Sequence, residues 1–191
     1  PTEGAQCGLR ISGQVRWAAA NGTEHPVYGM QINVKDASPC LDSTLMTLYT
    51  DRDGNYDTGE FCCSDDPFPC GGGPCDLYLE LVTEGTPEQF QGSASPPILV
   101  DVEDDIIFIS YSFETPDEDE KFPSGHQVQW NYTFDNTDAS RAASVLSAGV
   151  WIADYANELS PESGPSPDYV QINWPSTLPT SFNCILNSIH L

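Results

Sequence analysis

The sequence predicts a mainly β protein, in which a β-sandwich is followed by one helix and short strands. Apolar and polar residues alternate in several short segments, which is the pattern of half-buried strands. Stretches rich in Gly and Pro separate these segments, and the period changes to that of a helix only once, after Asp135. With 191 residues, 39% of them hydrophobic, the chain is long enough to bury a core.

Two strands are predicted in the first part of the chain. Residues 9–17 alternate apolar and polar side chains, and residues 30–35 repeat the pattern with Met30, Ile32 and Val34 on one side. Because side chains alternate across a strand, each segment presents one apolar face to a core.

Residues 43–61 are predicted to form the hairpin around which the sandwich is organised. Two runs of strand-forming residues meet at a tight turn that contains Gly54. The first run carries Leu45 on one face and Met46 on the other. We therefore expect this strand to lie inside a sheet.

Further segments follow the Cys-, Pro- and Gly-rich loop at 62–75. Residues 77–81 alternate as a strand, whereas residues 83–97 contain enough Gly and Pro to predict a mobile linker. Alternation then predicts strands over residues 98–102, 107–113 and 128–134.

A helix is predicted over residues 139–159, with its N-cap at Asn136, Thr137 or Asp138. Its apolar positions form two adjacent stripes: Ala142, Leu146, Val150 and Ala153, and Val145, Ala148, Ile152 and Tyr155. A narrow polar edge is expected from Ser140, Ser144, Ser147, Asp154 and Glu158. So broad an apolar face needs a sheet or a neighbour to cover it. Short strands are expected over residues 169–174 and 182–191.

The charge balance restricts the partners. With 29 acidic and 6 basic residues, the formal net charge is -23, which disfavours binding to nucleic acid or to an anionic membrane. Cations, neutral glycans and proteins are the partners that this charge allows, although acidity also serves solubility alone. No apolar run is long enough for membrane insertion.

The cysteines predict a disulfide-bonded, secreted protein, because their spacing does not match zinc sites. The seven candidates for disulfides are Cys7, Cys40, Cys62, Cys63, Cys70, Cys75 and Cys184. An odd number leaves one thiol over, and we expect it to be Cys7 or Cys184. Because Cys62 and Cys63 point to opposite faces of a strand, they are expected to have separate partners.

Two N-x-S/T sequons predict N-linked glycans at Asn21 and Asn131, which agrees with an extracellular location. Asn131 falls on the polar face of the strand expected at 128–134, where a glycan could project into solvent.

The turn in the central segment offers an alternative metal site. Asp51, Asp53, Asn55 and Asp57 alternate oxygen-bearing side chains around Gly54, as a calcium loop does. Counted from Asp51, however, Gly is fourth rather than sixth, and a turn without metal is the preferred interpretation. No other cofactor is expected.

Three motifs resemble the carboxypeptidase-regulatory, or transthyretin-like, domain. They are G-x-V at Gly13 and Val15, P-V-x-G-M-x-I-x-V from Pro26 to Val34, and T-D-x-D-G-x-Y from Thr50 to Tyr56. The resemblance implies that residues 1–115 form a transthyretin-like or immunoglobulin-like β-sandwich, usually a non-catalytic part of a secreted protein.

Residues 116–191 resemble the opening segment of the catalytic domain of secreted metallopeptidases. The resemblance is carried by A-S-R-A-A-x-x-L-x-A-x-x-W-x-x-D-Y from Ala139 to Tyr155, by V-x-I-x-W-P from 170 to 175, and by N-x-I-H-L from 187 to 191. Those enzymes continue into H-E-x-x-H, which is absent here. We therefore expect no catalytic residue and no enzyme activity.

The function expected from these features is that of an extracellular structural glycoprotein subunit. A strand–helix–strand segment without its partner half leaves apolar surface and strand edges open, and open edges recruit other strands. We expect copies of the chain to form a fibre or layer by donating a terminal strand, residues 7–17 or 182–191. The alternatives are the non-catalytic N-terminal region of a secreted metallopeptidase and a calcium-dependent glycan-binding module.

Overall fold

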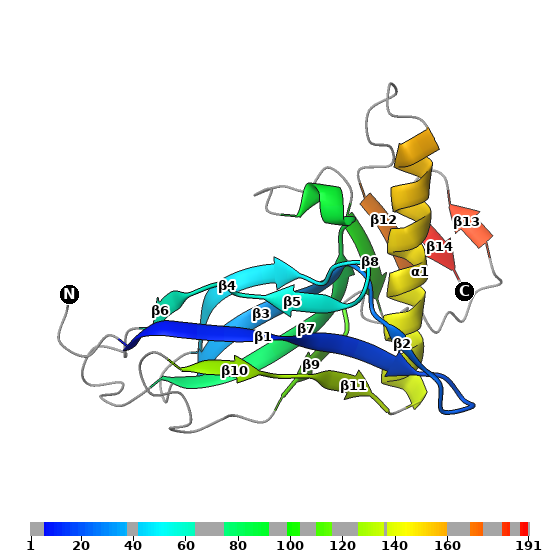
Figure 1. The fold of residues 1–191 in the computed structure, drawn as a ribbon. Helices are drawn as coiled ribbons and strands as arrows, with labels where there is room; N and C mark the ends of the chain where they lie inside the picture. The colour runs from blue at the N-terminus through cyan, green and yellow to red at the C-terminus, as the bar shows by residue number, and fades with distance from the viewer. Residues whose placement is uncertain are drawn as a thin grey trace.

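The structure, a computed structural model, describes residues 6–37, 42–63, 75–91, 99–103, 110–115, 126–135, 137–159, 169–173, 181–183 and 188–190. These residues form two β-sheets that face each other, and one helix stands across the end of the sandwich (Figure 1). The mainly β sandwich with a C-terminal helix is therefore confirmed.

One sheet is organised around strand β1 (Gln6–Ala18). Along one edge β1 pairs antiparallel with β2 (Glu24–Pro26), β5 (Asn55–Asp57) and β6 (Phe61–Cys63). Along the other edge it pairs parallel with β10 (Gln127–Gln129) and β11 (Tyr132–Phe134). Within this single chain, both edges of residues 7–17 therefore carry ladder hydrogen bonds, and donation of this strand to a neighbour stays a prediction.

The second sheet runs in the order β13-β14-β12-β8-β7-β3-β4 among the described strands. These strands are β3 (Met30–Ala37), β4 (Ser43–Tyr49), β7 (Asp76–Gly85), β8 (Leu99–Glu103), β12 (Tyr169–Asn173), β13 (Ser181–Asn183) and β14 (Ser188–His190). A further strand, β9 (Ser112–Glu114), pairs with β7. Strands from after residue 116 therefore take part in both sheets.

The central segment is not a hairpin. β4 pairs with β3 in one sheet, whereas β5 pairs with β1 in the other, so the turn at residues 50–54 carries the chain between sheets. The turn is tight, as predicted: the Gly54 amide donates to the Asp51 carbonyl at 2.9 Å. β4 lies at the end of its sheet, and none of its residues is buried. A strand at the edge of a sheet does not need a fully buried face, so β4 can carry apolar side chains on both of its faces.

The prediction of a mobile linker over residues 83–97 is also wrong for the first part of this range. β7 continues to Gly85, and the buried Thr83 hydroxyl donates to the Val102 carbonyl at 2.8 Å. A 3-10 turn, η1 (Glu88–Phe90), follows. Residues 92–98 lie outside the described part. Thr83 and Glu84 continue the strand because the neighbouring strand β8 provides hydrogen-bond partners for them.

The remaining strands were predicted in position but are shorter than expected. The segment 128–134 is divided into β10 and β11, and the segment 182–191 contributes β13 and β14, which form an antiparallel pair. Of residues 107–113, the structure describes only 110 onward. β10 and β11 run in the same direction along β1, so a break in the ladder separates them, whereas β13 and β14 run in opposite directions.

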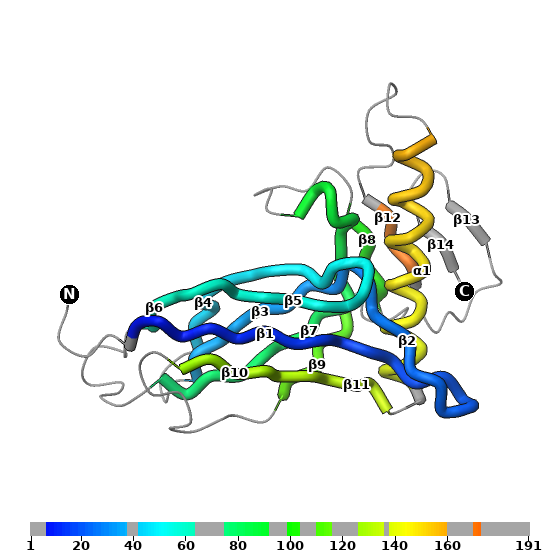
Figure 2. The backbone as a smooth tube through the Cα atoms, viewed as in Figure 1, coloured from blue at the N-terminus to red at the C-terminus, as the bar shows by residue number. Residues whose placement is uncertain are grey.

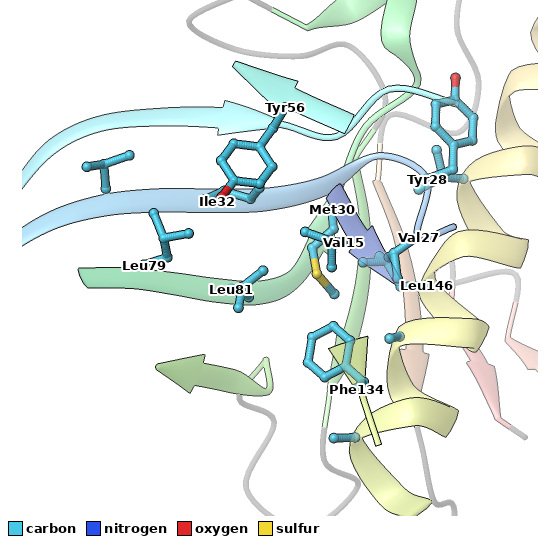
Figure 3. Close-up of a cluster of buried hydrophobic side chains, with 14 of the residues drawn as sticks. Val15, Val27, Tyr28, Met30, Ile32, Tyr56, Leu79, Leu81, Phe134 and Leu146 are labelled. Carbon is cyan, nitrogen blue, oxygen red and sulfur yellow. The ribbon is translucent and has the colours of Figure 1, made fainter. Parts of the chain in front are cut away.

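The core lies between the two sheets and extends under the helix. The predicted apolar faces of β1, β3 and β7 are buried, and Figure 3 shows Met30, Phe134 and Leu146 near one another where the sandwich meets the helix. The core thus joins both sheets and the helix in one continuous cluster.

Helix α1 (Thr137–Leu159) begins within the predicted cap region and passes across β8 and the end of the sandwich (Figure 2). Of the two predicted apolar stripes, the stripe of Ala142, Leu146, Val150 and Ala153 is buried, whereas Ile152 and Tyr155 of the other stripe are exposed. The predicted polar edge is wrong in part, because Ser140, Ser147 and Asp154 are also buried. Among the described residues, no helix is long and apolar enough to cross a membrane.

Candidate functional site

Four large apolar side chains are exposed on one side of the C-terminal half of α1. Trp151 is 43% exposed, Ile152 69%, Tyr155 62% and Leu159 66%. Because Trp151, Ile152 and Leu159 are each three or four residues from Tyr155, the four side chains form a continuous surface, which we call the apolar helix face. Exposed apolar patches of this kind are typical of protein-binding surfaces.

The opposite side of α1 is fixed closely against the sheets. A Cβ atom at Gly149 would lie 2.8 Å from Val100 and 2.9 Å from Ile172, so the helix backbone approaches β8 and β12 closely. Val150 lies over Gly29, whose positive φ of 76° suits glycine. The helix therefore presents its apolar face from a rigid support.

A buried polar network ties the same part of α1 to the sandwich. Asp154, only 2% exposed, accepts hydrogen bonds from the Tyr28 hydroxyl at 2.9 Å and from Arg52 at 2.6 Å. Arg52 also donates to Glu158 at 3.0 Å. The Tyr28 hydroxyl in turn accepts from the Glu88 amide at 2.9 Å. This network connects four segments that lie far apart in the sequence.

Burial determines the electrostatics of this network. Removal of the Tyr28 hydroxyl from water raises its pKa to about 12, so it stays a hydrogen-bond donor at neutral pH. The Arg52 guanidinium lies 5.4 Å from the ring centre of Trp151, a cation–π distance. Trp151 also contacts the Tyr28 ring. The network therefore orients Trp151 at the border of the apolar helix face.

Sequence reasoning did not identify this network. Tyr28 is an unspecified position in the P-V-x-G motif, and Asp154 was assigned to a polar edge. Arg52 is the unspecified position in T-D-x-D-G. The signal that the sequence offers is a carboxylate, Asp154, beside apolar positions of the helix. Its partners Tyr28 and Arg52 lie more than a hundred residues away, so the sequence does not reveal them.

The carboxylates of the candidate calcium loop serve the fold. Asp51 accepts hydrogen bonds from the amides of Asp53 and Asn55, at 2.9 and 2.8 Å. Asp57 pairs with Arg10 and accepts from the Gly59 amide, and these bonds lower its pKa to about 2. Such hydrogen bonds from backbone amides to an Asp side chain are typical of turns that bind no metal. Calcium binding stays a prediction.

Both sequon asparagines are exposed. Asn21 lies in the turn between β1 and β2, where its side-chain oxygen accepts from the Thr23 amide at 3.0 Å. Asn131 lies between β10 and β11, and its oxygen accepts from the Gln14 amide at 3.0 Å. Within the described part of the chain, the amide nitrogen of each side chain has no hydrogen-bond partner, so the atom to which a glycan would be attached is accessible. Glycosylation at both residues stays a prediction.

Two disulfides are present among the described residues: Cys7–Cys62 and Cys63–Cys75. The prediction that Cys62 and Cys63 have separate partners is confirmed. Of the two candidates for the unpaired thiol, Cys7 is paired. Cys40, Cys70 and Cys184 lie outside the described residues. Asp36 lies beside the Cys63–Cys75 pair, but these sulfurs bond to each other, so they provide no thiolates for a metal.

Comparisons with known proteins do not identify a family. No family model and no curated protein matches the chain. A solved structure of a 9R-lipoxygenase from Cyanothece PCC8801 aligns with a TM-score of 0.39 and 14% identity, over 85% of this chain. The chain spans 25% of the length of that enzyme. A similarity at this level indicates neither fold nor function.

Proposed function

We propose that the chain is a non-catalytic structural subunit of an extracellular glycoprotein assembly, and that it self-associates through the apolar helix face. The observation that carries this proposal is the exposure of Trp151, Ile152, Tyr155 and Leu159 on a helix whose other side is already packed. Burial of one such side chain contributes about 1.5–3 kcal/mol. The partner surface must therefore be apolar.

A second copy of the same helix face is the partner that this surface fits. In an antiparallel pair of α1 helices centred on Tyr155, the exposed Trp151 of one copy lies beside the exposed Leu159 of the other. A two-fold axis repeats this contact, so the pairing is self-complementary.

A second contact would extend such pairs into a fibre or layer. β4 lies at the end of its sheet, and its outer edge pairs with no strand in the described part of the chain. Two copies can pair β4 edge to edge across another two-fold axis. Because one molecule would then carry two different two-fold contacts, alternation of the two contacts gives an open polymer.

Sedimentation velocity over a range of protein concentrations tests the proposal. The wild-type protein should grow in mass with concentration. Ile152→Glu places a charge at the centre of the apolar helix face, and should weaken association at least about tenfold. Thr47→Glu, on the exposed side of β4, should leave dimers and remove longer species.

Gln127→Glu provides the matched control, because it adds the same charge at an exposed residue of β10, which lies in the sheet that does not contain β4. This variant should associate as the wild type does. A wild type that stays monomeric at all concentrations, or an Ile152→Glu variant that associates normally, would disprove self-association through α1.

A further inference from the structure

A polar groove of about 540 Å³ lies on the outer surface of the sheet that contains β1. Its lining includes Ser12, Gln14, Tyr49, Asn55, Gln129 and Asn131. These residues come from β1, from the end of β4, from β5 and from the β10–β11 segment. No described residue of α1 belongs to the lining of the groove.

The register of the sheet places these side chains in two rows. Ser12 pairs with Asp57 on one side and with Gln129 on the other. Two residues further along β1, Gln14 pairs with Asn55, and its amide donates to Asn131. Because Ile11 and Val15 point into the core, the intervening side chains face solvent. Neighbouring strands hold the members of a row about 4.8 Å apart.

Some polar atoms of the groove are already used. The Gln14 side-chain amide donates to the Asp53 carbonyl at 2.7 Å, and its oxygen accepts from Arg16 at 2.8 Å. Three side-chain groups in the groove bond to no described residue: the amide of Gln129, the hydroxyl of Ser12 and the amide nitrogen of Asn131. They provide both donors and acceptors along one side of the groove.

This chemistry selects a neutral ligand rich in hydroxyl groups. An anion would meet the Asp51 and Asp57 carboxylates in the lining and the net charge of -23. The carboxylate of Asp57 is already neutralised by Arg10, which reduces the attraction for a cation. Hydroxyl groups of a sugar both donate and accept, as the free amides and hydroxyl of the groove do. Tyr49 adds an aromatic surface at one end.

We infer that the groove is a binding site for neutral carbohydrate. One source of that carbohydrate lies in the lining itself, because the Asn131 amide nitrogen is the acceptor atom of the Asn131-Tyr132-Thr133 sequon. The bond from the Gln14 amide fixes the oxygen of Asn131 against β1, so the nitrogen occupies the outer position. The first sugars of a glycan attached there lie over the groove. The other source is a glycan from another molecule.

Substitution of Thr133 separates the two sources without changing the lining. Thr133→Ala removes the sequon and leaves Asn131 in place, whereas Thr133→Ser keeps the sequon. Both variants are produced in a glycosylating host, and mass spectrometry records whether Asn131 carries a sugar. Calorimetry then measures the binding of cellotetraose, mannotriose and chitotriose, which are neutral oligosaccharides.

Binding to Thr133→Ala but not to a glycosylated Thr133→Ser shows that the protein's own glycan fills the groove. Binding to both variants shows that the ligand comes from another molecule. Failure of all three sugars to bind either variant overturns the inference.

A second pair of variants tests the location. In the Thr133→Ala background, Gln129→Ala should weaken sugar binding about tenfold, the equivalent of one lost hydrogen bond. Gln127→Ala is the matched control, because Gln127 is an exposed residue of the same type on the same strand but outside the lining. Equal effects of the two substitutions, or no effect of Gln129→Ala, would place the sugar elsewhere.

Discussion

Asp154 is the residue that links the helix to the sandwich most directly. Its buried carboxylate receives hydrogen bonds from the neutral Tyr28 hydroxyl and from the partly exposed Arg52 guanidinium. A buried carboxylate is costly unless such partners satisfy it. The same residue therefore stabilises the helix position and the orientation of Trp151, which Arg52 and Tyr28 both contact.

We expect Asp154→Ala to lower the free energy of unfolding by about 2–3 kcal/mol, because two donors lose a charged acceptor in a buried setting. Glu158→Ala removes a second partner of Arg52, but Glu158 is 54% exposed, so its loss should cost less than about 1 kcal/mol. Urea denaturation of both variants measures the difference. Equal losses would mean that burial of Asp154 adds nothing to the strength of the network.

The pairing of Asp57 with Arg10 predicts a pH dependence of stability. The folded pKa of Asp57, about 2, lies below the ordinary value of about 3.9 in an unfolded chain. Its contribution is therefore fully present above about pH 4 and is lost as the pH falls towards 2. Both side chains are more than 40% exposed, so solvent reduces the effect.

The stability difference between the wild type and Asp57→Asn should be present near pH 7 and should shrink as the pH falls from about 4 to about 2. Urea denaturation at several pH values measures it. A difference that stays constant over this range would contradict the assigned ion pair.

At the scale of elements, the strands and the helix could be predicted from alternation, but their pairing could not. Residues 43–61 contain two strands and a tight turn, as their sequence indicates, yet the strands belong to different sheets. A tight turn fixes only the local direction of the chain. The partner of each arm depends on contacts with β1 and β3, which lie elsewhere in the sequence.

The turn that connects the sheets should be sensitive to substitution at Gly54. Gly54 and Gly59 both have positive φ, 77° and 64°, so alanine is strained at each by about 1–2 kcal/mol. A Cβ at Gly54 would also lie 2.5 Å from the Val15 carbonyl, whereas Gly59 faces open space. Gly54→Ala should therefore destabilise the protein by at least about 1 kcal/mol more than Gly59→Ala. Thermal and urea denaturation of the two variants test this ranking.

The two disulfides should contribute unequally to stability. Cys7–Cys62 closes a sequence separation of 55 residues and joins β1 to β6, whereas Cys63–Cys75 closes a separation of 12. From chain entropy alone, the expected contributions are about 4 and about 3 kcal/mol. Paired Cys→Ser replacements, followed by urea denaturation, compare them. The opposite ranking would mean that native contacts around Cys63, which is buried, outweigh loop length.

At the scale of the whole molecule, the acidic net charge opposes the proposed self-association. Each copy carries a formal charge of -23, so copies repel one another at low ionic strength. Salt shortens the range of this repulsion, from about 10 Å at 0.1 M to about 3 Å at 1 M. Contacts between apolar helix faces are not weakened in the same way.

Association of the wild type should therefore strengthen between about 0.1 M and about 1 M sodium chloride. Light scattering at fixed protein concentration follows the change. Ile152→Glu should form nothing larger than dimers paired through β4 at both salt concentrations, because a buried glutamate disfavours the contact between helix faces itself. Dissociation of the wild type by salt would indicate an ionic interface instead of an apolar one.

The candidate sites differ in how far sequence alone could predict them. The apolar stripes of α1 indicated that the helix has surface to cover, and Ile152 and Tyr155 were placed beside the buried stripe. Which stripe faces the sheets could not be predicted, because Gly29 and Gly149 decide how closely the helix approaches. The groove was not foreseen either, since it depends on the register of β1 with β5 and β10.

The position of β1 has a consequence for how the protein is made. This strand is synthesised well before its parallel partners β10 and β11, as the separation of 117 residues between Gln14 and Asn131 shows. Until they emerge from the ribosome, one edge of β1, a strand with one apolar face, has no native partner. Such long-range pairing slows folding and leaves a nascent chain open to wrong strand associations.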